Sequence, residues 1–281
     1  MQEPRADFLF VLILGILSML TPLAIDMYLP AFLNIANDFS VSQEKIQTTL
    51  ALFTFGFAFG QLFWGPLSDS YGRKPIILIG IVVSALVSLG ITQVKHIEHF
   101  YALRFVQGFF GASPAVVTGA LLRDLFAKNE FARQMSMIMI VTMIAPLLAP
   151  VLGGYLTDWF HWHIIFYVLM ALGLVCALLV FFKIPETLPL ARRTPLKIGS
   201  ILKVFGRLLS NKKVLGYIFC NSLSYSGMFC FLSAGSIVYT GLFGVAPKHF
   251  GYFFLLNILV MMTATSLNGK FVTKIGVEKS L

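Results

Sequence analysis

The sequence predicts an all-α membrane protein whose helices cross the bilayer eight times. Of its 281 residues, 58% are hydrophobic and only 12% are charged, and the mean hydropathy is +0.85. A soluble domain is about half apolar and about a quarter charged, so this chain has too few polar groups to cover a surface in water. Lipid offers no hydrogen-bond partners to an open strand, so the spanning segments must be helical. These observations disfavour soluble enzymes, disordered proteins and secreted disulfide scaffolds.

Eight uncharged runs give the spans in order. Each is long enough to cross about 30 Å of hydrocarbon at about 1.5 Å per helical residue. They are residues 8–25, 46–68, 75–94, 105–122, 134–157, 159–182, 214–247 and 249–269. We expect the first run to be a membrane helix and not a cleaved signal peptide, because only Arg5 precedes it, no small-residue cleavage site follows and the helical pattern continues past Asp26.

The basic residues predict how the chain is oriented. The formal net charge is +9, and the spans place 17 of the 21 Lys and Arg residues on one side of the membrane and three on the other, with Arg104 inside the fourth span. Cytoplasmic loops carry the excess of Lys and Arg. We therefore expect a cytoplasmic amino terminus, and we interpret the basic charge as a topology signal and not as a nucleic-acid surface.

The polar segment 184–212, which contains three prolines, predicts a division of the chain. It separates a six-helix bundle at 1–183 from the start of a second bundle at 213–281, and we interpret it as a cytoplasmic linker. Gly65 and Gly72, seven residues apart, follow the second span, and a glycine pair with the same spacing, Gly269 and Gly276, occurs 204 residues later. This weak echo favours a parallel repeat of two halves, which would need about 400 residues. We expect four further helices, although a complete protein of eight spans is the alternative.

Two charges inside the spans are the candidate functional residues. Asp26 lies about six residues, or roughly 9 Å, below the outer boundary, and Arg104 lies roughly 10 Å below it. Ionisable groups at such depth rarely face lipid. Opposite charges at matched depth predict a shared hydrated cavity. Two alternatives stay open: Pro22 and Pro30 could end the apolar helix early and leave Asp26 in the wet interface, and Arg104 could snorkel to the headgroups.

A carboxylate in such a cavity can bind a proton. Desolvation favours the neutral acid and a nearby guanidinium favours the charged form, so a substrate can tip the balance. Competition between proton and substrate for one cavity is sufficient to couple their exchange. Gln107, Gly108 and Gly111 share one face of the helix with Arg104, and this small, polar face is suited to lining a cavity or packing closely.

Three strings resemble motifs of the major facilitator superfamily. The string GPLSDSYGRKP, residues 65–75, resembles its cytoplasmic signature loop, and LRFVQGFFGA, residues 103–112, is similar to its fourth-helix proton-transfer motif. The string APLLAPVLGG, residues 145–154, is similar to the fifth-helix antiporter motif, with Ala145 and Ala149 where that motif has glycine. Residues 20–30 and 231–235 resemble drug/proton antiporters of the bicyclomycin-resistance type.

The resemblance implies a major facilitator fold with a complete amino-terminal half and the first two helices of the second half. It implies that Asp26 binds the proton, that Arg104 is its relay partner, and that Asp69 and Arg73 latch the outward-open state. It also implies where other residues lie. We expect Tyr28, Gln107 and Gly108 in the substrate cavity, Gly65, Asp69, Gly72, Arg73 and Lys74 in a cytoplasmic gating loop, and Pro146, Pro150, Gly153 and Gly154 on the antiporter helix.

The expected function is a bacterial inner-membrane antiporter that exports amphipathic drugs, such as bicyclomycin-like or chloramphenicol-like compounds, in exchange for protons. We expect a monomer in the lipid bilayer, with no enzyme activity, nucleic-acid partner, cofactor or metal. His161 and His163 are two ligands two residues apart, which do not make a metal site, and with Trp159 and Trp162 they predict an interfacial belt. The alternatives are a sugar, amino-acid or peptide carrier, or an inactive fragment or membrane interaction protein.

Overall fold

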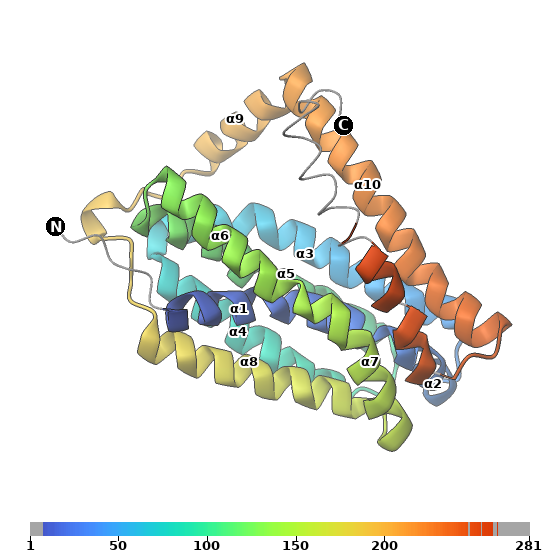
Figure 1. Ribbon diagram of the computed structural model, residues 1–281. Coiled ribbons are helices and arrows are strands. Elements are labelled where there is room, and N and C mark those ends of the chain that lie inside the picture. The colour runs from blue at the N-terminus through green and yellow to red at the C-terminus, as the bar shows by residue number, and fades with distance from the viewer. Residues whose placement is uncertain (1–7, 247, 254, 261–262, 264–281) are drawn as a thin grey trace.

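The computed structural model describes residues 8–246, 248–253, 255–260 and 263, and over these residues the chain is helical without a strand (Figure 1). The fold class that the sequence predicts is confirmed. The elements are α1 Phe8–Asp26, η1 Leu29–Ala31, α2 Phe32–Asp38, α3 Gln43–Tyr71, α4 Arg73–Ile91, α5 Ile97–Leu125, α6 Lys128–Thr142, α7 Ile144–Trp159, α8 His163–Lys183, η2 Leu190–Arg192, α9 Ile198–Leu209, α10 Lys212–Ser236 and the π-helical turn η3 Ile237–Leu242.

Seven of the described helical segments are long and apolar enough to cross a membrane. They correspond to seven of the eight predicted runs. The first spans Phe8–Asp38, because α1, η1 and α2 follow one another with a break around Pro30, and the fifth joins α6 and α7 over Glu130–Trp159. The eighth predicted run, 249–269, lies partly outside the described residues, and its described part belongs to a shorter apolar helix, Lys248–Val260.

Glycines bring α3 and α5 into backbone contact. A Cβ atom added at Gly56 would lie 2.1 Å from the Phe105 carbonyl oxygen, and one added at Gly108 would lie 2.0 Å from the Phe53 carbonyl oxygen. Both distances are far below van der Waals contact, so only glycine fits at either position. Small residues allow such approach between membrane helices. This contact holds the middle of α5, which carries Arg104 and Gln107, against α3.

The predicted linker is not wholly irregular, because α9 lies within it. The apolar side chains of α9 recur at helical spacing, as at Ile201 and Phe205, and alternate with the basic residues Lys203 and Arg207. Counting uncharged runs could not find this helix, because its charges interrupt every run. Figure 1 shows α9 apart from the six-helix bundle and α10 approaching the bundle only toward its far end, near α2, and no residue of Lys212–Phe231 is buried.

Candidate functional site

Arg104 lies in the core of the first half, enclosed by aromatic rings. Its side chain projects from α5 and is 0% exposed. The guanidinium carbon lies 4.5 Å from the ring centres of both Tyr28 and Phe53, and 5.9 Å from that of Phe166. These are cation–π distances. The alternative of an arginine that snorkels to the headgroups is therefore wrong, since protein side chains cover the whole group.

The polar contacts of Arg104 link it to α1 and to a chain of hydrogen bonds. Its Nη1 donates to Gln107 Oε1 at 2.7 Å and to the Ala24 carbonyl oxygen at 3.3 Å. Gln107 Nε2 in turn donates to Ser88 Oγ at 2.8 Å, and the Ser88 hydroxyl donates to the Ser84 carbonyl at 2.9 Å. The network joins α5 to both α1 and α4.

Two nitrogens of the Arg104 guanidinium, Nε and Nη2, are buried without a hydrogen-bond partner among the described atoms. Leaving a buried donor unpaired costs about 1–3 kcal/mol, and more for a charged group. Native proteins rarely accept this cost outside functional sites. The unpaired edge of Arg104 is therefore available to water or to an oxygen that arrives during function.

Asp26 does not pair with Arg104, which corrects the expectation of a shared pocket. Asp26 is the last residue of α1, only 5% exposed, and the described residues offer it neither an ion pair nor a hydrogen bond. Arg104 contacts the same helix two residues earlier, at the Ala24 carbonyl, and aromatic rings cover its faces. The alternative that Asp26 sits in the wet interface is also wrong, because protein side chains bury the carboxylate.

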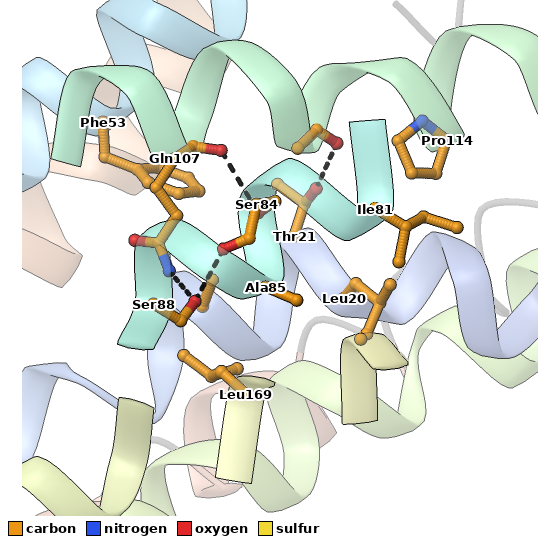
Figure 2. A pocket seen from close by; sticks show the side chains of 13 residues that line it. Leu20, Thr21, Phe53, Ile81, Ser84, Ala85, Ser88, Gln107, Pro114 and Leu169 are labelled. Carbon is orange, nitrogen blue, oxygen red and sulfur yellow. Dashed lines mark hydrogen bonds between the residues drawn. The ribbon is translucent and has the colours of Figure 1, made fainter. Parts of the chain in front are cut away.

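A small cavity of about 30 Å³ lies beside the polar network (Figure 2). Thr21, Ser84, Ser88 and Gln107 line it, together with apolar residues of α1, α3, α4, α5 and α8. A water molecule needs about 10–15 Å³ of such volume, so the cavity has room for about two waters and not for a drug. Asp26 and Arg104 are not among its lining residues.

The three predicted cavity residues have separate places. Gln107 lines the cavity. Tyr28 is instead fully buried against Arg104, and its hydroxyl donates to Thr49 Oγ1 at 2.6 Å. Gly108 packs against the Phe53 backbone, so its role in the structure is helix contact. The helical spacing of the sequence placed Gln107 and Gly108 near one face of α5. It could not show that Gln107 lines the cavity while Gly108 packs against α3.

The predicted gating loop forms an ion-pair cluster around Arg73. The Arg73 guanidinium contacts Asp69 Oδ1 at 2.5 Å and Asp124 Oδ2 at 2.9 Å, and its Nη1 donates to Ser68 Oγ at 2.7 Å. Arg73 is buried, while the Asp69 side chain is 51% exposed. The cluster therefore ties α3, α4 and the end of α5 together within the first half.

Glu186 of the linker caps α4, a role that the sequence did not reveal. Its carboxylate accepts from the backbone amides of Arg73 at 3.0 Å and Lys74 at 3.3 Å. A carboxylate at a helix amino terminus is favourable because it meets unpaired N–H groups and the positive end of the dipole. Gly72 has φ = 107° and leaves no room for a side chain beside Glu186, so glycine is needed there. Gly65, by contrast, has only ordinary contact distances around it.

The predicted antiporter helix corresponds to α7, which packs its small residues against the end of α1. Pro150, Gly153 and Gly154 are buried, and Pro146 is half-buried. A Cβ atom at Gly153 would lie 2.0 Å from the Met27 carbonyl oxygen. Because Met27 follows Asp26, the glycine face of α7 lies directly beside the chain segment that carries the buried carboxylate.

Residues 14–281 match the family model described as the Major Facilitator Superfamily. The chain belongs to the major facilitator superfamily. It is 54% identical over 281 residues to a bicyclomycin resistance protein homolog of Haemophilus influenzae, covering all of this chain and 71% of that relative. It is 38% identical to the uncharacterised MFS-type transporter YdgK of Bacillus subtilis, covering 92% of this chain and 65% of the relative. It is 30% identical to multidrug resistance protein MdtL of Klebsiella pneumoniae, covering 82% of this chain and 58% of the relative.

Solved structures of low sequence identity share the fold. A bacterial homolog of the human lysosomal transporter Spinster matches with a TM-score of 0.73 at 17% identity, covering 98% of this chain and 64% of that one. The human organic anion transporter MFSD10 matches with a TM-score of 0.65 at 19% identity, covering 93% of this chain and 71% of that one. These likenesses show the fold; the family match over residues 14–281 and the seven candidate spans make the chain a multi-pass membrane protein of a transporter family and not an enzyme, as the sequence predicts.

Sequence reasoning missed the partners that position the site. Phe53 and Phe166 enclose Arg104, and Asp124 and Glu186 hold Arg73, yet none of the four belongs to a string that we singled out. The chain has 28 phenylalanines, so composition could not select the two that contact the guanidinium. Asp124 stands in the last turn of α5, which is an ordinary place for a solvated carboxylate.

Proposed function

We propose that this chain acts in proton-coupled efflux of amphipathic drugs. Major facilitator proteins are transporters, and the named relatives include a bicyclomycin resistance protein homolog and a multidrug resistance protein. Because the chain spans between 58% and 71% of the length of the three relatives, the activity is proposed for the whole transporter to which this sequence corresponds. Bicyclomycin-like and chloramphenicol-like compounds are the proposed cargo.

The observation that carries the proposal is the buried Asp26 carboxylate. It lies within the first membrane-spanning segment, it is 5% exposed, and it has no described cation or hydrogen-bond donor. A charge in such a place is costly unless a proton or a ligand neutralises it. We infer that Asp26 takes up the proton and that cargo binding favours its release.

Arg104 acts in this proposal as a positioning residue. Its bond to the Ala24 carbonyl fixes the turn of α1 before Asp26, while Tyr28 and Phe53 hold its guanidinium in place. Its unpaired Nε and Nη2 can donate hydrogen bonds to a water or to a cargo oxygen near that turn. The cavity of about 30 Å³ is too small for a drug, so cargo binds outside it and the cavity serves water.

The proposed setting is the bacterial inner membrane with a cytoplasmic amino terminus. The excess of Lys and Arg on the Arg73 side of the bundle supports this orientation. In this frame residues 1–183 form the first bundle, 184–212 the cytoplasmic linker and 213–281 the beginning of the second bundle. We propose that the protein works as a monomer and that the Arg73 cluster holds the linker against the first bundle.

Drug-driven proton movement in vesicles tests the proposal. The purified whole transporter that contains this sequence is reconstituted in proteoliposomes with an internal pH dye, and bicyclomycin or chloramphenicol is added. We expect a drug-dependent pH change with the wild type and none with Asp26→Asn. Asp158→Asn is the matched control, because Asp158 is a carboxylate already paired with Lys248 at 3.3 Å, and it should behave as the wild type.

Each other outcome contradicts part of the proposal. Unchanged proton movement in Asp26→Asn would place the proton site elsewhere. Proton movement driven by sugars, amino acids or peptides and not by drugs would favour another carrier of the superfamily. A folded wild-type chain without any transport would favour an inactive fragment or a membrane interaction protein.

A further inference from the structure

Three side chains of metal-binding type meet at the end of the bundle opposite the Arg73 cluster. Asp38 ends α2, and His161 and His163 flank Trp162 just before and at the start of α8. One ligand atom of each lies within 4.8 Å of the others. The sequence offered only two histidines two residues apart, which is too few for a site. The fold supplies the third group by bringing α2 beside this turn.

The two imidazoles point their Nδ1 atoms at each other. His161 Nδ1 and His163 Nδ1 are in hydrogen-bond contact, and the rings stack with centres 4.5 Å apart. In a zinc site the Zn–N distance is about 2.0–2.1 Å, so two imidazole nitrogens on one ion lie roughly 3.3 Å apart. A small opening of the two rings therefore admits an ion between the two Nδ1 atoms, which are now in direct contact.

Trp162 holds the third group in position. Its indole Nε1 donates to Asp38 Oδ2 at 2.9 Å, and the same carboxylate oxygen lies 3.8 Å from His161 Nε2. The Trp162 ring also stacks on His163, with centres 3.8 Å apart. Trp162 itself is buried in the core. Trp162 thus orients two of the three groups, Asp38 and His163, as outer-shell contacts orient metal ligands.

We propose that Asp38, His161 and His163 bind a divalent transition-metal ion of the zinc type. Imidazole nitrogen and carboxylate oxygen are its usual ligands, and three protein ligands leave a fourth position for water. The His161 and Asp38 side chains are 58% and 44% exposed, so an ion can reach them from solution. The bound ion links α2 to the start of α8, and its binding is independent of the proposed transport.

Zinc binding to the whole chain tests this site. The protein is purified without a histidine tag, and its affinity for Zn²⁺ is measured by competition with a chelating dye at pH 7.5, alongside its melting temperature. We expect one saturable site that raises the melting temperature. The double variant H161Q/H163Q should bind at least tenfold more weakly and lose the thermal shift, and D38N should weaken binding to a lesser degree.

The matched control removes the other neighbouring pair of histidines. His96 and His99 have ring centres 5.8 Å apart and belong to no described group of three ligands, so H96Q/H99Q should keep the wild-type affinity. The inference is overturned if Zn²⁺ does not bind the wild type, or if H161Q/H163Q binds as tightly as H96Q/H99Q. X-ray absorption at the zinc edge of the wild type needs no variant: two imidazole ligands are expected, and fewer would overturn the site.

Discussion

Replacing Gly108 by Ala tests whether the middle of α5 is held by helix packing. The added Cβ would lie 2.0 Å from the Phe53 carbonyl oxygen. A close C···O contact is about 3.3 Å, so α3 and α5 must separate by about 1.3 Å. Overpacking of this kind costs about 1–3 kcal/mol. Alanine favours the helix over glycine by up to about 1 kcal/mol. With the packing cost at its upper end, the net loss in the free energy of unfolding is therefore about 2 kcal/mol.

The assay is thermal unfolding of the purified protein in detergent, read from helical circular dichroism. A loss of about 2 kcal/mol lowers the melting temperature by about 5 °C. Gly90→Ala is the matched control, because Gly90 also lies in a membrane-spanning helix but its Cβ would meet only Leu103 at 3.5 Å. We expect this variant to melt at or above the wild-type temperature. Equal melting of the Gly108→Ala variant and the wild type would refute the packing role.

Four further substitutions test the contacts around Arg73 and Arg104. Arg73→Ala should lower the free energy of unfolding by about 3 kcal/mol in chemical unfolding, because it leaves Asp124 without its ion pair in a partly buried cluster. Asp69→Asn should lower it by no more than about 1 kcal/mol, since the Asp69 side chain is exposed. Equal losses of stability in the two variants would contradict this assignment. Glu186→Ala should speed hydrogen exchange at the Arg73 and Lys74 amides that it caps, as mass spectrometry can measure, and unchanged exchange would argue against the cap. Arg104→Lys should lower stability by about 2 kcal/mol, because an ammonium cannot stack between two rings as the guanidinium does; a stability equal to the wild type would show that the stacking contributes nothing.

Periodicity and charge were sufficient for the membrane architecture. Uncharged runs locate membrane helices because every charge in hydrocarbon is costly, and seven described spans lie where those runs predict them. The same criterion missed α9, whose Lys203 and Arg207 interrupt each run. It also joined α6 and α7 into one run, because the break at Met143 carries no charge.

The candidate site was predicted in its residue types and not in its contacts. Depth along a helix places Asp26 and Arg104 at similar levels but says nothing about rotation around the helix axis. In the structure the Arg104 guanidinium faces the rings of Tyr28 and Phe53, so it does not form an ion pair with Asp26. Contacts between distant segments, such as Glu186 with the start of α4 or Asp38 with Trp162, depend on the fold and leave no local pattern.

The protonation state of Asp26 during drug binding tests the central claim most directly. Infrared difference spectra of the isotope-labelled protein, recorded before and after bicyclomycin is added, report carboxyl groups that gain or lose a proton. We predict that drug binding removes a protonated-carboxyl band that is absent from Asp26→Asn. A band that persists with the drug bound, or that disappears equally in Asp26→Asn, would show that this buried acid does not exchange its proton for cargo.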